Sequence, residues 1–307
     1  MKIQRIALTT DFTTCAREAY GPTADLATRF GARIELVHWM DHPFPYMPFG
    51  LEQRWVREHR EAARARLEAE AQDPLFKDVS VGPHLMDGYG SQGLERFLND
   101  THVDLVAQAS HGYTGLKRVV RGSFTERLLR RAATPVLTFK ADEGTPFAGT
   151  FLPTKILFPH DFSACSAHAA EAVRFFAKAY GARVVVLNAW QHLPTYYDFH
   201  GLAGDVMSTQ LATLYQEMPA RLGQDLTEFA ARELAGIGHE TRVMLGDPAE
   251  LIVAQATSWG ADLICMATHG WTGFQHLMFG SVAERVARTA PCPTLTVRPR
   301  DEALRAP

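Results

Sequence analysis

Two stretches of the sequence combine glycines, a histidine and a serine in a spacing that suits anion binding. Residues 267–281 read ATHGWTGFQHLMFGS, and residues 109–123 read ASHGYTGLKRVVRGS. The glycine after the histidine, Gly270 or Gly112, lets the backbone approach a ligand closely. The later Gly-Ser pair precedes a segment predicted to be helical, and a helix N-terminus presents N–H groups that bind phosphate. The pattern therefore predicts a phosphate site, with ordinary turn chemistry as the competing interpretation.

These loops belong to a repeat that covers the whole chain. Moving the sequence by 150 residues places Asp11 on Asp161, and moving it by 158 residues places the first loop on the second. So many matches in register indicate two copies of one domain, the second with about eight additional residues in its middle. A segment rich in Gly, Pro and Thr at 141–154 separates the copies. We expect copy one to span residues 1–146 and copy two to span residues 147–307.

Strand-like and helix-like segments alternate in each copy. Short apolar runs such as RIALTT and KILFPH end at a turn, as buried parallel strands do, and helical patterns that end in glycine follow them. This alternation predicts an α/β fold of two Rossmann-like domains, each a parallel sheet with helices on both faces. Ligands of such sheets bind at the carboxyl ends of the strands. Asp11 and Asp161 lie at that edge, where a carboxylate accepts hydrogen bonds from a ribose or an amine, and capping of the following helix is the alternative.

Bulk composition narrows the classes of function. The chain has 307 residues, 46% of them hydrophobic and 21% charged, which is typical of a globular protein with two domains. A net charge of −3 disfavours a dedicated nucleic-acid binder. No apolar run reaches the roughly 18–20 residues of a membrane helix, and the N-terminus has no apolar signal segment. The four cysteines form no C-x-x-C pair, so we expect a cytoplasmic protein with reduced thiols that has neither nucleic acid nor membrane as a partner.

The motifs resemble those of the universal stress protein family, whose nucleotide-binding members carry G-x-x-G, nine residues and then G-[ST]. The strings DFT at 11–13 and DFS at 161–163 resemble that family's first-strand signature. The sequence departs from the pattern at the first glycine, which is Ala109 or Ala267. The resemblance covers nearly the whole chain twice, so it implies a tandem protein. It further implies an adenine nucleotide alpha hydrolase-like fold in which each five-stranded sheet has the order 3-2-1-4-5.

The resemblance also implies a function and its ligands. It implies a stress-response protein that binds ATP, ADP or AMP, with Mg²⁺ present only alongside the nucleotide, and that acts as a sensor or regulator. Weak ATP hydrolysis or autophosphorylation is an alternative, although the chain has no Walker lysine in G-x-x-x-x-G-K-[ST] form. A second alternative is a nucleotide-free interaction protein that binds another small ligand or an unidentified protein.

Motif by motif, the resemblance assigns nucleotide-binding residues in both copies. In copy two these are Pro159, Asp161, Ala189, Ala267, His269, Gly270, Gly280, Ser281, Val282 and Ala283. In copy one these are Asp11, Trp39, Ala109, His111, Gly112, Gly122, Ser123, Phe124 and Thr125. Copy two is favoured because Ala189 and Val282 leave room that Trp39 and Phe124 would fill. The opposing argument is charge, because the copy-one loop carries Lys117, Arg118 and Arg121, which attract phosphate unless they form a solvated helix face.

Several of these residues have a second interpretation. Ser123 and Ser281 fit plain N-caps, and the two loop histidines fit a positional role better than catalysis or a metal site. Cys15 and Cys165 fall near a helix start that stabilises a thiolate, which suggests redox sensing, with a buried small residue as the alternative. Each copy ends in a strand, PVLTF or PTLTV, at a sheet edge that invites pairing. Since the family dimerises through that edge, we expect the two copies to form an intramolecular pseudo-dimer.

Overall fold

The structure is a computed structural model that describes seven segments of the chain. These are residues 1–40, 49–87, 92–111, 134–141, 150–191, 205–268 and 280–298. The chain divides into two compact units, of which the first contains Met1–Phe151 with Pro293–Arg298 and the second contains Leu152–Cys292. The boundary predicted between residues 146 and 147 stays a prediction, because residues 142–149 lie outside the described segments.

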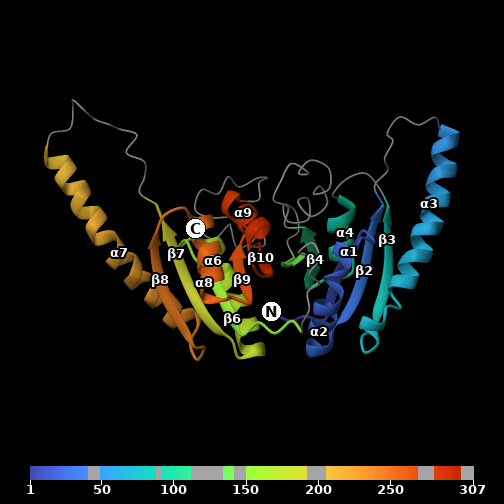
Figure 1. The fold of residues 1–307 in the computed structure, drawn as a ribbon, viewed down its shortest axis with the longest axis horizontal. Helices are drawn as coiled ribbons and strands as arrows, with labels where there is room; N and C mark the ends of the chain where they lie inside the picture. Colours follow the sequence, from blue (N-terminus) through green and yellow to red (C-terminus); the bar gives the residue numbers. More distant parts are fainter. Residues whose placement is uncertain are drawn as a thin grey trace. The chain divides into compact units, whose positions relative to one another are not determined.

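The first unit is built on parallel strands in the predicted order (Figure 1). Its strands are β1 (Arg5–Thr10), β2 (Arg33–Met40), β3 (Val81–Asp87), β4 (Leu105–His111) and β5 (Val136–Ala141). They lie in the order β3-β2-β1-β4-β5, and each neighbouring pair is parallel. Copy one therefore has the 3-2-1-4-5 order. The unit also contains β10 (Thr294–Val297), the last strand of copy two, which runs antiparallel to β5.

The second unit repeats this winding. Its strands are β6 (Lys155–Pro159), β7 (Arg183–Trp190), β8 (His239–Leu245) and β9 (Leu263–Ala267), in the parallel order β8-β7-β6-β9. Continuous apolar runs form these central strands because helices cover both faces of such a sheet. All five residues of β9 are buried, as are Ile156, Leu157 and Phe158 of β6.

Helices connect the strands of each unit. In the first unit they are α1 (Thr14–Arg17), α2 (Tyr20–Phe30), α3 (Phe49–Glu70), the short 3₁₀ helix η1 (Pro74–Phe76) and α4 (Gln92–Asp100). In the second they are α6 (Ala164–Tyr180), α7 (Asp205–Glu233), α8 (Pro248–Trp259) and α9 (Ser281–Thr289). The helix after the first strand ends at Gly31 and Gly181, both left-handed at φ 62° and 64°, which confirms the two predicted glycine C-caps.

One helix differs between the copies. The sequence predicts a single helix after the first strand of each copy, and α6 is continuous, but copy one has the separate helices α1 and α2. Pro22 explains the break, because it has no N–H to donate to the carbonyl of Glu18, whereas the same place in α6 is Ala172. Pro22 instead lies in the first turn of α2, where no such bond is needed.

Candidate functional site

The turn that follows the first strand has the same unusual backbone in both copies. Phe12 has φ 64° and Phe162 has φ 62°, in the left-handed region that non-glycine residues seldom occupy. The conformation costs about 1–2 kcal/mol at each residue. Since both copies keep this strain at the carboxyl end of the central strand, the turn is a candidate part of a functional site.

Aspartate and a hydroxyl residue hold this turn together. Asp161 Oδ1 accepts hydrogen bonds from Ser163 N at 3.1 Å and from Ser163 Oγ at 2.6 Å. Ser163 Oγ accepts in turn from Ser166 N at 3.1 Å and is the N-cap of α6. Thr13 plays the same part beside Asp11 in copy one. The alternative in which the two aspartates cap the helices is therefore wrong, because each one positions the residue that does.

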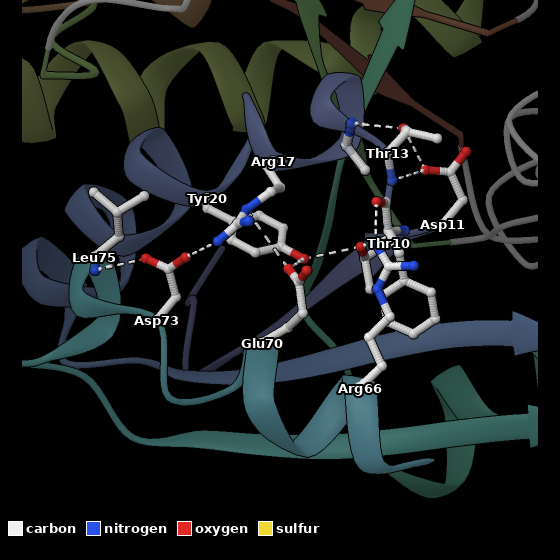
Figure 2. A network of polar contacts seen from close by, with 11 residues as sticks. Thr10, Asp11, Thr13, Arg17, Tyr20, Arg66, Glu70, Asp73 and Leu75 are labelled. Carbon is white, nitrogen blue, oxygen red and sulfur yellow. Dashed lines mark hydrogen bonds and ion pairs between the residues drawn. The ribbon is translucent and has the colours of Figure 1, made fainter. Parts of the chain in front are cut away.

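In copy one, a polar network that includes side chains of α3 stabilises the turn after the first strand (Figure 2). Arg66 Nη2 donates to the carbonyl of Phe12 at 2.8 Å, and its guanidinium lies 4.7 Å from the centre of the Phe12 ring. The buried Tyr20 hydroxyl lies 2.8 Å from both Thr10 Oγ1 and Glu70 Oε2. The end of the first strand, the start of α2 and the end of α3 are thereby joined through hydrogen bonds.

The network continues to the surface of the first unit. Arg17 pairs with Asp73 and lies 3.8 Å from Glu70 Oε2. Burial raises the pKa of Tyr20, so the phenol stays protonated and donates to one of its two partners. The Tyr20 hydroxyl donates to Glu70 Oε2, since a carboxylate oxygen accepts hydrogen bonds.

Copy two fills the corresponding place with aromatic side chains. His160, which matches Thr10, stacks on Phe229 of α7 with ring centroids 3.8 Å apart. Only 4% of His160 is exposed, and burial lowers the pKa of its imidazole to about 4. The imidazole is therefore neutral at physiological pH.

The carbonyl at the end of the first strand is held by a side chain from the second strand. Asn188 Nδ2 donates to the carbonyl of His160 at 2.8 Å, and in copy one His38 Nδ1 lies 2.8 Å from the carbonyl of Thr10. Since a carbonyl only accepts, His38 carries its proton on Nδ1. The sequence predictions missed all four of these residues, namely Thr10, His38, His160 and Asn188. Comparison of the copies could have found them, because His38 and Asn188 match at the same offset as Asp11 and Asp161.

The N-terminus of α9 is the second part of the candidate site. Gly280 N donates to the carbonyl of Thr268 at 2.8 Å, so the residues on either side of the glycine loop are joined. Gly280 is the N-cap of α9, and Glu284 N makes the first helical bond, to the carbonyl of Gly280, at 2.9 Å. The amides of Ser281, Val282 and Ala283 come before that bond, so the helix offers them no acceptor.

One sequence expectation about this helix start is wrong. Ser281 is not the N-cap, because the helix begins at Ser281 and the cap is Gly280. The backbone angles of Gly280, φ −61° and ψ 138°, are open to any residue. What the glycine provides at this position is the absence of a side chain beside the exposed N–H groups.

The topology brings most of the predicted copy-two residues to one edge of the sheet. Pro159 ends β6 and precedes Asp161, Ala267 ends β9, and β6 pairs directly with β9. Ala189 is the half-buried next-to-last residue of β7. In copy one, Asp11 follows β1, while Trp39 belongs to β2, and Ala109 and His111 to β4. The remaining predicted residues, His269, Gly270, Gly112, Gly122, Ser123, Phe124 and Thr125, lie outside the described segments, as do the loop cations Lys117, Arg118 and Arg121.

An ion pair connects α9 to α8. Arg285 Nη1 lies 2.9 Å from Asp247 Oδ2 and Arg285 Nη2 lies 3.4 Å from Glu250 Oε1. Asp247 is also the N-cap of α8, where its Oδ1 accepts from Glu250 N at 3.0 Å. This backbone hydrogen bond, followed by the Arg285 guanidinium, lowers the pKa of Asp247. Arg285, in the second turn of α9, therefore joins this helix to the first turn of α8.

The cysteines are buried, which bears on the redox hypothesis. Burial, followed by the charges of Asp11 and Glu18, raises the pKa of Cys15 to about 12. The expectation of a stabilised thiolate at Cys15 is wrong, because desolvation and two carboxylates outweigh the helix start. Cys165, Cys265 and Cys292 are buried as well, which is typical of small apolar residues in a core.

The comparison with known proteins matches both copies to one family. The sequence profile of the universal stress protein family matches residues 2–140 and again residues 153–298. The chain belongs to the universal stress protein family. The sequence prediction of a tandem universal stress protein is thereby confirmed.

Individual relatives support this assignment. A universal stress protein of Methanocaldococcus jannaschii is 34% identical over 150 residues, which cover 49% of this chain and 85% of the relative. One of Thermus aquaticus is 32% identical over 144 residues, which cover 47% of this chain and 97% of the relative. The crystal structure of a universal stress protein from Archaeoglobus fulgidus has a TM-score of 0.60 at 18% identity and covers 98% of both chains. This last likeness supports the fold alone.

Two further properties concern the described segments only. Among their helices, none is both long enough and apolar enough to cross a membrane. Within the same residues, no group of three or more His, Cys, Asp and Glu side chains is arranged to hold a metal ion.

Proposed function

We propose that this universal stress protein binds an adenine nucleotide at the carboxyl edge of the second unit's sheet and acts as a regulator through that binding. The observation that carries the proposal is the start of α9. There a residue without a side chain, Gly280, caps the helix, and three amides precede the first helical hydrogen bond. Such a helix start binds phosphate oxygens through N–H groups and the helix dipole.

The neighbouring strand end supplies the second half of the site. The end of β6 lies beside the end of β9, and paired strands are about 4.8 Å apart. Asp161 follows β6 in a turn that its own hydrogen bonds to Ser163 make rigid. A carboxylate repels phosphate and accepts from hydroxyl or amino groups, so we assign the sugar or base to Asp161 and the phosphates to α9.

The nucleotide fits these residues without a protein-bound metal. Mg²⁺ prefers oxygen ligands and keeps several waters, so it would arrive on the nucleotide's own phosphates. The chain lacks a Walker lysine, which supports binding and regulation over phosphoryl transfer. Hydrolysis of ATP at a low rate is the enzymatic alternative that the binding experiment also tests.

The last strands support a proposal about assembly. β5 and β10 pair antiparallel, with Leu137 opposite Leu295, so each strand occupies an edge that would otherwise be open to another chain. We propose that the two copies use these strands as an intramolecular pseudo-dimer, and that the full chain is monomeric in solution. Light scattering that gives a dimer mass at micromolar concentration would contradict this.

Direct binding to nucleotide-stripped protein tests the proposed function. The chain is unfolded, freed of small molecules, refolded and titrated with ATP, ADP, AMP and GTP by calorimetry, with and without Mg²⁺. We expect adenine nucleotides to bind more tightly than GTP, and the supernatant of the first unfolding step to contain adenine nucleotide. Absence of binding by any of the four at millimolar concentration overturns the proposal. Release of phosphate during the titration would favour the enzymatic alternative.

A further inference from the structure

The outermost strands of the two copies, β3 and β8, present different outer edges. Each has a neighbour on one side only, β2 or β7, and within the described segments no strand pairs with the other side. The two pairs have the same register, because Leu36 of β2 lies opposite Pro83 and Val186 of β7 lies opposite Thr241. Pro83 of copy one and Thr241 of copy two therefore occupy matching positions.

The backbone at these two positions points away from the sheet. In a parallel pair, alternate residues of a strand direct their N–H and C=O groups toward the same neighbour. Val184 N donates to the carbonyl of Gly238 at 2.9 Å, and copy one has the matching bond. The even-numbered residues of β3 and β8 thus bond inward, whereas Pro83 and Thr241 belong to the alternate set that faces outward.

Copy one blunts this edge, and copy two leaves its donors in place. Pro83 has no N–H, and a proline on an edge strand prevents another strand from pairing there. Gly82 precedes it, and a glycine weakens a strand. Thr241 keeps its N–H, and its Oγ1 lies 3.2 Å from Thr227 Oγ1 of α7. The outer edge of β8 therefore has a backbone donor at the place where β3 has none.

Two opposite charges flank Thr241 on β8. Arg242 Nη2 lies 2.5 Å from Glu240 Oε1, and the two side chains are 34% and 42% exposed. Consecutive side chains of a strand point to opposite faces, so this pair lies on the face away from α7. In copy one the matching residues are Gly82 and His84, so no carboxylate stands at the place of Glu240. The charged pair and the outward N–H thus occur together in copy two alone.

We propose that the outer edge of β8 binds an extended segment of a partner protein as an additional antiparallel strand, the orientation that is more stable per residue. Glu240 and Arg242 bond inward, so they would occupy the non-hydrogen-bonded positions of the new pair, where opposite side chains are closest. The partner therefore places an acidic residue opposite Arg242 and, two residues later, a basic residue opposite Glu240. Three residues before the acidic one, an apolar side chain covers Leu245, which is 51% exposed. The edge thus recognises the pattern apolar-x-x-acidic-x-basic.

Exchanging the charges tests both the place and the direction of binding. The probe is a soluble, fluorescently labelled peptide of alternating valine and threonine that carries this pattern. In the control peptide the acidic and the basic residue are exchanged, so the composition is the same. By fluorescence anisotropy, the wild type should bind the probe about tenfold more tightly than the control. The variant E240R/R242E keeps an ion pair within β8 with its signs reversed, and it should prefer the control peptide.

The backbone of the edge is tested by a second pair of variants. Thr241→Pro gives copy two the proline of copy one and should abolish the binding of both peptides, because it removes the outward N–H. Thr241→Val keeps that N–H and should bind as the wild type does. Urea unfolding confirms that both variants are folded. None of these measurements needs a nucleotide, so they are independent of the proposed function.

Four results would overturn the proposal. They are the absence of peptide binding at millimolar concentration, binding that survives in a folded Thr241→Pro variant, a preference that E240R/R242E leaves unchanged, and self-association in place of peptide binding. The last is measured by sedimentation of the wild type and Thr241→Pro. An acidic residue two places before a basic one is also what β8 itself carries, so self-association that the proline abolishes would identify a second copy of the chain as the occupant.

Discussion

The imidazole of His160 lies flat on the ring of Phe229, with the ring centroids 3.8 Å apart and the planes 17° from parallel. The stack joins the end of β6 to α7, beside the strained turn that holds Asp161. A second ring, that of Phe158, lies 6.2 Å from Phe229. Because the surroundings are apolar, protonation of the imidazole is unfavourable in the folded chain.

This stack predicts a pH dependence of stability. An unfolded histidine binds its proton near pH 6.5, whereas His160 in the folded chain binds it only near pH 4. The stability that the neutral imidazole provides is therefore fully present above about pH 6.5 and is lost as the pH falls toward 4. The loss is on the order of 2–3 kcal/mol. His160→Phe keeps a ring on Phe229 and removes the titration, so its free energy of unfolding in urea should fall less between pH 7 and pH 4.5 than that of the wild type. Equal falls in the two proteins would show that His160 does not titrate as the structure requires.

The repeat explains how much of this fold was predictable. Strand order followed from the alternation of elements and the family resemblance, because both depend on patterns that the chain displays twice. The division of one helix into α1 and α2 was missed although Pro22 is visible in the sequence, because the comparison of copies favoured one helix in both.

The contacts within the site were harder to predict. His160 and Phe229 are far apart in the sequence, and nothing in their local patterns pairs them. The same holds for Tyr20 and Glu70, which lie on the different helices α2 and α3. The N-cap of α9 was predicted one residue too late, at Ser281 instead of Gly280, because Gly-Ser is compatible with a cap at either residue and only the backbone angles decide.

The cap of α6 gives a second prediction. Ser163→Ala removes the acceptor for Ser166 N and the hydroxyl that donates to Asp161. Loss of such a cap costs about 1–2 kcal/mol, and Asp161 keeps only the hydrogen bond from the backbone N–H of residue 163, so its carboxylate is held less firmly and ATP affinity should fall as well. Ser163→Thr is the matched control, because threonine holds the same place in copy one. It should restore most of the stability and the affinity, as measured by urea unfolding and calorimetry. A threonine variant as impaired as the alanine variant would contradict the capping role.

The pair between Arg285 and Asp247 gives a third prediction. The two side chains are 42% and 32% exposed, so the ion pair should stabilise the fold by less than about 1 kcal/mol. Asp247→Asn keeps an oxygen for the cap of α8 and loses only the charge, whereas Asp247→Ala loses both and should cost about 1–2 kcal/mol. The loss of unfolding free energy in Asp247→Asn relative to the wild type should shrink in 1 M NaCl. At that salt concentration the screening length falls to roughly 3 Å, so the charge of Arg285 contributes less. A salt-independent penalty would show that the charge of Arg285 is not what Asp247 requires.

Acid should lower the free energy of unfolding that Asp247 contributes as the cap of α8. The pKa of Asp247 is lowered in the folded chain, so its contribution to stability is present above the ordinary pKa of an aspartate and is lost as the pH falls below it. The comparison of Asp247→Asn with the wild type therefore belongs at pH 7, where this carboxylate is ionised in both the folded and the unfolded chain.

Gly280 gives the most direct test of where the phosphates lie. Its φ of −61° and ψ of 138° suit any residue, so Gly280→Ala and Gly280→Val should both fold. Both are poor N-caps compared with glycine, and each should lower the free energy of unfolding by about 1 kcal/mol or less. Their side chains differ in size, however, and a branched valine beside the amides of Ser281 and Val282 obstructs a phosphate far more than a methyl group does.

We therefore expect the two variants to agree in stability and to differ in binding. By calorimetry, Gly280→Val should lose at least about a hundredfold in ATP affinity, which corresponds to about 2.7 kcal/mol, and Gly280→Ala should lose much less. Because the two substitutions weaken the cap alike, the difference between them reports the obstruction and not the stability of α9. ATP affinity that is unchanged in Gly280→Val would mean that the phosphates bind away from the N-terminus of α9, and the amides of this helix would then need another partner.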